Sequence, residues 1–357
     1  MRIAIDASRT TVARVTGTEQ YAIALIRALI RLNDGSHNFT LYFRDAPPPD
    51  LFPDDPHVTQ RVIPWRRAWT HLRFAAALWA DRPDVTFVPA HTLPFVFPGR
   101  AVVTVHDLGY RVFPRAHKTR DRLYLDLTTR FSAWRATRVL ADSQATAHDL
   151  TRFYGTPADK IRVVYPGVEP LPVGDVEAVR ARYRLPARYF LFLGTLQPRK
   201  NIARIVQAYA TYREAHGGDV GLVLAGGQGW LYDEAWTAGV DGVTLTGYVD
   251  DADRGALYAG AEALVFPSLY EGFGFPVLEA LHAGTPVIAS STSSLPELVG
   301  DAGLLVDPLD VAAIARAMAA VKPDVVHGQA QAARFTWDAA GRAVLDVFAE
   351  IAGIARK

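Results

Sequence analysis

Two carboxylates stand eight residues apart in the segment FPSLYEGFGFPVLE, residues 266–279. Pro276 lies between them and suits the first position of a helix, so Glu271 is expected on a loop and Glu279 in the first turn of that helix. The positive end of the helix dipole favours an ionised Glu279 there. Its two oxygens could accept both hydrogen bonds of a ribose diol, and an ordinary first-turn acid is the alternative for this residue taken alone.

The loop between the two carboxylates contains Gly272 and Gly274. Glycine lets a ligand approach the backbone closely because it has no side chain. The amides of Phe273, Gly274 and their neighbours could therefore bind sugar hydroxyls or phosphate oxygens, although such glycines can also serve only to make a turn. Taken as a whole, the segment favours a binding site for a sugar or a phosphate.

Short β-branched and aromatic runs alternate with stretches of helical period along the whole chain. This alternation is typical of βαβ units and a parallel sheet. The first half is expected to contain strands at 2–6, 39–43, 58–63, 84–88, 101–105, 138–142 and 161–164, with helices near 18–33, 66–80, 118–136 and 144–154. The second half is expected to contain strands at 189–193, 220–224, 243–246, 263–266, 287–289 and 303–306.

A stretch rich in proline and glycine, residues 165–174, separates the two sets of elements. The sequence therefore predicts an α/β protein with two doubly wound, Rossmann-like domains, over residues 1–168 and 169–337, that face a central cleft. Apolar residues recur at helical spacing in 338–357, which predicts a C-terminal helix that packs back on the first domain. Open α/β sheets bind ligands at the carboxyl ends of their strands, so the chemistry is expected in the cleft.

Composition excludes several other kinds of protein. The 357 residues carry 38 Lys and Arg against 37 Asp and Glu, far from the basic excess of a non-specific nucleic-acid binder, so no nucleic-acid partner is expected. There is no cysteine, which excludes disulfides and thiolate metal sites. No apolar run suits a signal peptide or a membrane span. The dehydrogenase glycine motif, the P-loop and the HExxH zinc motif are absent as well.

Several ordered motifs resemble those of glycosyltransferase family 4, whose members are retaining enzymes that use nucleotide sugars and have the GT-B fold of two Rossmann-like domains. The two glutamates have the family's spacing of Glu, seven residues, Glu. The likeness extends over nearly the whole chain and is strongest from residue 189 to residue 308. The matching segments are EGFGFPVLE around these glutamates, GTPVIA at 284–289, GTLQPRKN at 194–201, VHDL at 105–108 and VYPGVE at 164–169.

The resemblance implies that Glu271 contacts the donor sugar and that Glu279 holds the nucleotide ribose. Arg199 and Lys200 follow the first strand of the second domain and are expected to open the next helix. Cations oppose the helix dipole at that end, so a functional role in binding the diphosphate is favoured over a solvated helix face. No divalent metal and no other cofactor is then expected, and the nucleotide sugar is a co-substrate.

His106 and Asp107 follow the strand at 101–105 and are expected at its carboxyl end. By resemblance, His106 lies against the hydroxyls of the donor sugar and the reaction centre. Asp107 could orient His106 or cap the next turn. Gly17 matches the loop in which family members bring a glycine-rich backbone up to the pyrophosphate or the acceptor, and an N-cap role for Thr18 is the alternative.

The resemblance extends the donor site to further positions. Thr195 stands directly after a strand glycine, where many family members carry an additional arginine. Tyr248 and Val249 lie where relatives meet the nucleotide base, and Ser294 is near the start of a helix that could add amides to the phosphate site. The DxD string within residues 250–253 is expected to start a helix rather than to hold a metal.

A basic run follows His106, and its members Arg111 and Arg115 are assigned to the acceptor side together with Asp107. Such a run is usually a solvated helix face, but its place on the acceptor-side domain suits a phosphate-bearing or membrane-anchored acceptor. A second surface of this kind would combine tryptophan with arginine, and peripheral membrane contact is an option for it. Its members are Trp65, Arg66, Arg67, Trp69 and Arg73.

Together these features predict a retaining glycosyltransferase that moves a hexosyl group from a nucleoside diphosphate sugar to a hydroxyl of a saccharide or lipid-linked acceptor. The string around Lys200 looks most like bacterial mannosyltransferases of surface polysaccharide assembly, which suggests mannosyl transfer from GDP-mannose. Two alternatives stay open, a sugar-nucleotide epimerase on the same fold and a non-catalytic subunit that binds nucleotide sugars. The expected location is the cytoplasm, up to the inner face of the cytoplasmic membrane.

Overall fold

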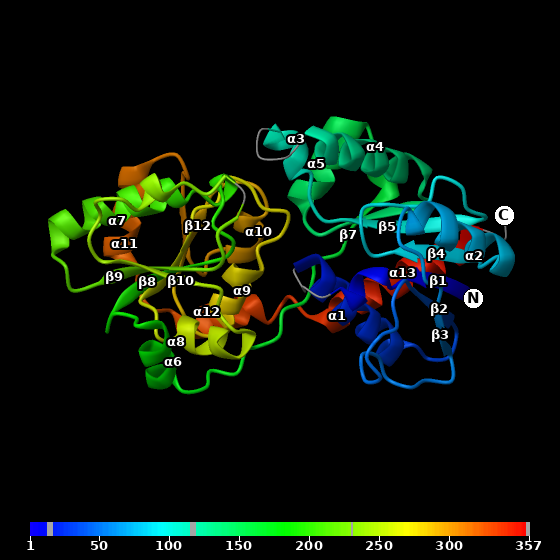
Figure 1. Ribbon diagram of the computed structural model, residues 1–357, viewed down its shortest axis with the longest axis horizontal. Coiled ribbons are helices and arrows are strands. Elements are labelled where there is room, and N and C mark those ends of the chain that lie inside the picture. The colour runs from blue at the N-terminus through cyan, green and yellow to red at the C-terminus, as the bar shows by residue number, and fades with distance from the viewer. Residues whose placement is uncertain (13–16, 115–118, 230, 355–357) are drawn as a thin grey trace. The chain divides into compact units, whose positions relative to one another are not determined.

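Contacts along the chain divide the protein, described here by a computed structural model, into two compact units (Figure 1). The first unit comprises Met1–Gly167 together with the C-terminal stretch that begins at Thr336, and the second is Val168–Phe335. The structure describes residues 1–12, 17–114, 119–229 and 231–354. Each unit contains one parallel sheet and is described by itself.

The sheet of the first unit has the strand order β3-β2-β1-β4-β5-β6-β7 within the described residues. The order changes direction between β1 and β4, as in doubly wound sheets. Central strands such as β4 are buried along their whole length, because helices cover both faces of a parallel sheet. The strands are β1 (Arg2–Asp6), β2 (Asn38–Phe43), β3 (Val58–Val62), β4 (Val85–Val88), β5 (Arg100–Val105), β6 (Arg138–Ala141) and β7 (Ile161–Val163).

Helices from both ends of the sequence cover the first sheet. The C-terminal helix α13 packs beside α1 (Figure 1), with Val344, Phe348 and Ile351 buried along its inner face. Phe74, Ala133 and other residues from α2, α4, α5 and the turn before α2 share one hydrophobic core with the sheet. The helices are α1 (Gly17–Leu32), α2 (Ala75–Asp81), α3 (Gly109–Val112), α4 (Thr119–Arg135), α5 (Gln144–Tyr154) and α13 (Trp337–Ile354).

One helix of the first unit begins later than the sequence predicts. A helix over 66–80 is expected, but Ala68 has a φ of 51°, in the left-handed region, which keeps the chain before it out of the helix. A π-helical turn over Thr70–Phe74 then leads into α2. Trp69 is buried by this geometry, and its indole N–H donates to the carbonyl of Ile63 at 2.7 Å. The prediction that Trp69 belongs to a surface was therefore wrong.

The sheet of the second unit has the order β10-β9-β8-β11-β12-β13 in the part of the chain that the structure describes, and its direction changes between β8 and β11. Two doubly wound units confirm the predicted α/β class. The strands are β8 (Tyr189–Leu193), β9 (Gly221–Ala225), β10 (Val243–Gly247), β11 (Ala263–Phe266), β12 (Val287–Ser290) and β13 (Leu304–Val306). The helices are α6 (Val176–Tyr183), α7 (Ile202–His216), α8 (Arg254–Ala259), α9 (Phe275–His282), α10 (Leu295–Val299), α11 (Val311–Ala320) and α12 (Val325–Ala332).

Among the described residues, no helix combines the length and the apolar character that crossing a bilayer requires.

Candidate active site

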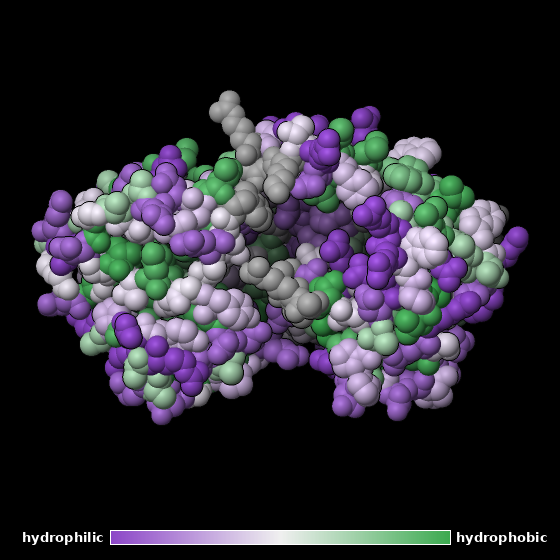
Figure 2. Space-filling model, viewed as in Figure 1, coloured by the Kyte–Doolittle hydropathy of each residue, from purple (hydrophilic) through white to green (hydrophobic). Residues whose placement is uncertain are grey.

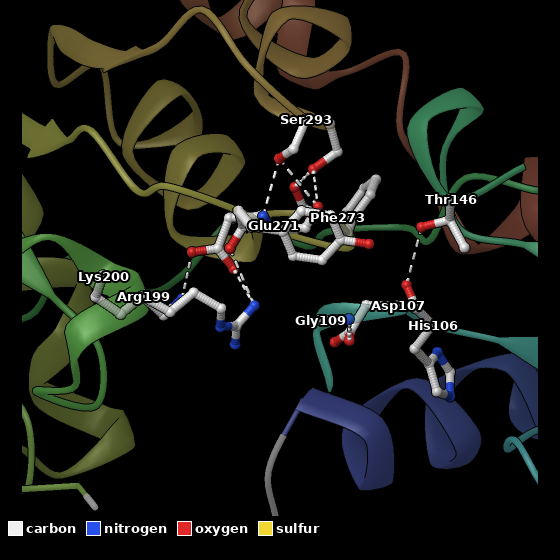
Figure 3. A network of polar contacts seen from close by, with 11 residues as sticks. His106, Asp107, Gly109, Thr146, Arg199, Lys200, Glu271, Phe273 and Ser293 are labelled. Atoms are coloured by element: carbon white, nitrogen blue, oxygen red, sulfur yellow. Dashed lines mark hydrogen bonds and ion pairs between the residues drawn. The ribbon is translucent and has the colours of Figure 1, made fainter. Parts of the chain in front are cut away.

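Three charged side chains meet where β8 and β11 end (Figure 3). The second sheet changes direction between these two strands, and ligands of open α/β sheets bind outside the carboxyl ends of the strands at such a point. Lys200 Nζ lies 2.6 Å from Glu271 Oε1, and Arg199 Nη1 lies 3.5 Å from Glu271 Oε2. The structure thus brings together three residues that the sequence analysis assigned to the reaction.

The environment of this triad keeps Glu271 ionised. Burial raises the pKa of the Glu271 carboxyl, but the Lys200 ammonium and the Arg199 guanidinium outweigh burial and hold that pKa below its ordinary value. Lys200 Nζ also lies 4.8 Å from the centre of the Phe266 ring, in a cation–π contact. The triad carries two positive charges and one negative charge, a composition suited to an anionic ligand.

The turn that carries the two cations is a 3₁₀ helix over Pro198–Lys200, and α7 begins at Ile202. The prediction that the cations open the long helix was therefore wrong. Asn201 separates the two elements with a φ of 65°, which asparagine tolerates better than most residues. Its side-chain amide donates to the carbonyls of Pro267 at 2.9 Å and Pro308 at 2.7 Å. These bonds tie the cationic turn to the residues that follow β11 and β13.

Two serines that follow β12 fix the loop that begins at Glu271 (Figure 3). Ser293 Oγ accepts the backbone N–H of Glu271 at 2.9 Å and lies 3.1 Å from the carbonyl oxygen of the same residue. The fully buried hydroxyl of Ser294 lies 3.1 Å from that carbonyl oxygen and also contacts the carbonyl of Phe273. The Ser294 hydroxyl thus holds the loop in place.

The end of this loop requires glycine. Gly274 has a φ of 131°, and a Cβ at that position would lie 2.7 Å from Leu295 Cδ2. Gly272 and Phe273 precede it and are buried as well. The positive φ, which residues with a side chain rarely adopt, explains why glycine stands at position 274.

Glu279 is the fifth residue of α9, so it lies beyond the first turn and the prediction of a first-turn acid was wrong. Its carboxylate is buried and its Oε2 receives the guanidinium of Arg254 in a short ion pair. The hydroxyl of Tyr258 donates to the same oxygen at 2.8 Å. Arg254 and Tyr258, rather than the helix dipole, therefore stabilise the charge of Glu279.

The other predicted donor residues of the second unit differ in exposure. Thr195 lies exposed directly after Gly194, and Tyr248 is exposed after β10. Val249 beside it is buried. Only Thr195 and Tyr248 of these could offer a side chain to a ligand without rearrangement.

The DxD string forms a 3₁₀ turn over Asp251–Asp253 directly before α8, as expected for a helix start. The Asp253 carboxylate accepts hydrogen bonds from Arg182 at 2.6 Å and from the Tyr183 hydroxyl at 2.8 Å. The structure therefore uses Asp253 to attach α8 to α6. Within the part of the chain that the structure describes, no three His, Asp or Glu side chains are grouped in a way that could hold a metal ion.

In the first unit, His106 lies at the carboxyl end of β5 with its ring buried next to α1 (Figure 3). Its Nδ1 is 2.7 Å from Asp142 Oδ2 and its Nε2 is 3.2 Å from the carbonyl oxygen of Pro89. Burial lowers the pKa of His106, but the Asp142 carboxylate outweighs burial and raises that pKa above its ordinary value. The ring of Tyr21 contacts the imidazole edge-on, with centroids 4.7 Å apart.

Asp107 caps the turn that follows, since its Oδ1 accepts the backbone N–H of Gly109 at 2.7 Å. The ring nitrogens of His106 contact Asp142 and Pro89 instead, so the structure favours the capping alternative for Asp107. Asp142 directly follows β6, the neighbour of β5, which explains why its carboxylate reaches His106.

The remaining predicted residues of the first unit lie on α1, on α3 and in a segment that the structure does not describe. Gly17 is the first residue of α1 and Thr18 the second, so Thr18 does not occupy the N-cap position. Arg111 lies 3.4 Å from Asp126, with its guanidinium over the ring of Phe153. The predicted acceptor-side residue Arg115 lies outside the described residues.

Comparison with known proteins places the chain in a family. Residues 15–170 match the family described as Glycosyltransferase Family 4, and residues 176–333 match Glycosyl transferases group 1. The O-antigen chain mannosyltransferase B of Escherichia coli is 36% identical over 281 residues, which are 73% of each chain. The chain belongs to glycosyltransferase family 4. The predicted family and the assignment as an enzyme are thereby confirmed.

Solved structures show that this glycosyltransferase has the predicted GT-B fold. A sucrose-phosphate synthase from Thermosynechococcus elongatus superposes with a TM-score of 0.72 at 23% identity and covers 99% of each chain. HepE from Anabaena, solved in complex with UDP-glucose, has a TM-score of 0.72 at 16% identity over 98% of this chain and 99% of its own. At these identities the likeness concerns the fold alone.

Sequence reasoning about the glycosyltransferase missed Asp142, Arg254 and Tyr258. Asp142 could have been found from the sequence. It ends the predicted strand 138–142, which is the next strand in the chain after 101–105, and His106 directly follows 101–105. Arg254 and Tyr258 have i, i+4 spacing on α8, which shows that they share a helix face but not which carboxylate they meet.

Replacing Asp142 by asparagine is expected to lower the pKa of His106, because the carboxylate that stabilises the imidazolium is removed. A histidine whose pKa is raised on folding contributes stability below its ordinary value of 6.5 and loses it as the pH rises through the folded-state pKa. In the variant, the free energy of unfolding should therefore no longer fall as the pH rises above 6.5. The measurements are NMR titration of the His106 ring and urea unfolding at several pH values.

The exposed Asp159 in the same unit provides the matched control, because Asp159→Asn should change neither result. An unchanged titration of His106 in Asp142→Asn would show that the 2.7 Å contact does not set its protonation.

Proposed function

We propose that the enzyme transfers a mannosyl group from GDP-mannose to a hydroxyl of a saccharide or lipid-linked acceptor, with retention of configuration and without a divalent metal. The observation that carries this proposal is the triad of Arg199, Lys200 and Glu271 at the ends of β8 and β11. The choice of the mannosyl donor is supported by the Escherichia coli relative, which is an O-antigen chain mannosyltransferase.

In the proposed reaction, the bond between the anomeric carbon and the β-phosphate oxygen breaks and its electron pair leaves with GDP. The acceptor hydroxyl oxygen forms the new bond on the same face of the sugar, and its proton passes to the departing phosphate. Lys200, Arg199 and loop amides stabilise the charge that develops on this phosphate. A pair of unit charges ~4 Å apart contributes up to about 4 kcal/mol at an effective dielectric constant near 20, so two cations could replace a metal ion.

The remaining roles are proposed from the family resemblance and the local geometry. Glu271 would contact the donor sugar while it orients Lys200. Glu279 would hold the ribose through Oε1, because its Oε2 already binds Arg254 and Tyr258. His106 stays a proposed contact of the donor sugar.

Further donor contacts are proposed for a set of residues that the sequence analysis assigned to the donor site. Backbone amides and exposed side chains are the groups that these residues could offer. The set is Gly17, Thr195, Tyr248, Val249, Gly272, Phe273, Gly274 and Ser294. Asp107, Arg111 and Arg115 stay proposed for the acceptor side.

The test incubates the purified chain with GDP-mannose or UDP-glucose, in the presence and absence of a mannose-terminated oligosaccharide and of EDTA. We expect GDP release that depends on the oligosaccharide, an α-mannosyl product by NMR, and no effect of EDTA. Loss of activity with EDTA would contradict the metal-free mechanism, and a β-linked product would contradict retention.

Two other outcomes would replace the proposal. A new sugar nucleotide formed without any acceptor would identify an epimerase. Binding of GDP-mannose, detected as a rise in unfolding temperature, with no turnover of either donor would indicate a non-catalytic subunit.

A further inference from the structure

Helix α4 has its polar and apolar residues on the opposite sides from those of an ordinary surface helix. Its buried residues are Thr128, Thr129, Ser132 and Ala133. Its exposed side includes Leu123, Leu127 and Trp134, with exposed fractions of 66%, 59% and 73%. Surface helices of soluble domains normally turn such residues toward the core. Among the described residues of this unit, the exposed side of α4 is therefore an apolar surface without a partner.

The inward polar residues of α4 have a structural reason. Ser132 Oγ accepts the backbone N–H of Leu93 at 2.9 Å, and Thr128 Oγ1 lies 3.4 Å from the hydroxyl of Thr92. Small hydroxyl residues on this side let the loop that follows β4 pack closely against the helix. Leu125 still packs against the core, but hydroxyls occupy most of the inner side, and Leu123, Leu127 and Trp134 lie on the outer side.

The apolar surface continues onto the neighbouring elements. His71 stacks on Phe95 with centroids 4.2 Å apart and contacts the Tyr124 hydroxyl at 3.2 Å. The ring of Phe95 contacts the ring of Phe131 of α4 edge-on, with centroids 5.1 Å apart. We refer to this surface as the α4 face, and in Figure 2 hydrophobic residues lie at the surface in the region of α4. The α4 face consists of Phe95, Leu123, Tyr124, Leu127, Phe131 and Trp134.

Cations accompany the α4 face. Arg120 and Arg130 are exposed and fall at helical spacing with Leu123, Leu127 and Trp134, on the same side of α4. The nearest acid along this side, Asp126, accepts a hydrogen bond from Tyr154 at 2.7 Å and lies 3.4 Å from Arg111. The surface therefore combines leucine and aromatic side chains with arginine.

We propose that the α4 face rests on an anionic lipid surface, with its leucine and aromatic side chains in the headgroup region and its arginines on lipid phosphates. Helices that lie in a bilayer interface combine large apolar residues with Lys or Arg in this way. Tyrosine and tryptophan suit the interface because one end of each side chain is apolar and the other polar. A second copy of this chain fits less well, since two such faces would oppose their arginines. The inference concerns a different surface from the proposed donor site.

The test measures binding of the full chain to vesicles of phosphatidylcholine alone and of phosphatidylcholine mixed with phosphatidylglycerol, by sedimentation and by the fluorescence of tryptophan. We expect binding to the mixed vesicles, weaker binding in high salt, and little binding to phosphatidylcholine alone. Absence of binding to the mixed vesicles would overturn the proposal.

Variants assign the binding to the α4 face. Leu123→Gln and Leu127→Gln should each weaken binding about tenfold, because each removes apolar area that enters the interface. Arg120→Gln and Arg130→Gln should each weaken it about fivefold at low salt. These side chains are exposed, so unfolding temperatures should stay unchanged.

Control variants in the second unit, and a measurement of the oligomeric state, complete the test. Leu309→Gln and Val326→Gln make the same kind of change at exposed positions of the second unit and should bind vesicles like the unaltered protein. If the α4 variants bound equally well, the proposal would be wrong. A dimer that Leu127→Gln converts to a monomer, without any vesicle binding, would assign the α4 face to a second copy instead.

Discussion

Replacing Lys200 by alanine is expected to lower kcat for mannosyl transfer by about 10²–10³-fold, the range seen when one preorganised group that stabilises developing negative charge is removed. The effect should fall mainly on kcat, because the charge on the leaving phosphate grows in the transition state. Steady-state release of GDP measures kcat. The affinity for GDP, measured separately, should change much less than kcat.

Loss of Lys200 also removes one of the two cations that face Glu271. Because Arg199 remains 3.5 Å from that carboxylate, a moderate loss of stability of about 1–3 kcal/mol is expected in urea unfolding. Lys322→Ala, an exposed change in the same unit, is the control and should alter neither quantity. Activity of Lys200→Ala within a few-fold of the unaltered enzyme would refute the proposed role of the triad.

Replacing Arg254 by methionine is expected to destabilise the protein by about 3–5 kcal/mol, because it leaves Glu279 as a buried carboxylate without its cation. The hydroxyl of Tyr258 remains as a hydrogen-bond donor to Glu279 but carries no charge. The free energy of unfolding in urea measures the effect. The apparent KM for the donor should rise as well, since Glu279 is the proposed ribose ligand.

A double variant separates the charge from the packing. Replacing both Arg254 and Glu279 by methionine removes the pair together, so most of the lost stability should return while donor binding stays weak. Arg316→Met, at a side chain that is 71% exposed, should change stability by less than about 0.5 kcal/mol. If Arg254→Met were as stable as that control, the buried ion pair would have no structural importance.

The strands that position the site could be predicted closely. The expected strands 189–193 and 263–266 coincide with β8 and β11. Parallel strands covered on both faces need continuous apolar runs, and these runs are visible in the sequence. Since Lys200 and Glu271 follow these two strands, the carboxyl-end rule for open sheets also predicts that they lie at one edge.

Local conformation was less predictable. The late start of α2 depends on the left-handed conformation of Ala68. Alanine rarely adopts that conformation, so the sequence does not predict it. The α9 helix begins at Phe275 with Pro276 in second place, so Glu279 falls one residue beyond the first turn. Shifts of one residue at a helix end are common, yet here such a shift changes which interaction stabilises a carboxylate.

The sequence by itself determined the family, the two parallel sheets and the residues that follow their strands. Hydrophobic period and the motifs at strand ends are local properties, and they need no knowledge of distant contacts. The tertiary structure alone decided that Glu271 forms its ion pair with Lys200 and Glu279 its ion pair with Arg254. It also decided that α4 turns Leu123 and Leu127 outward. The packing of separate elements determines which residues become partners, and sequence spacing does not record that packing.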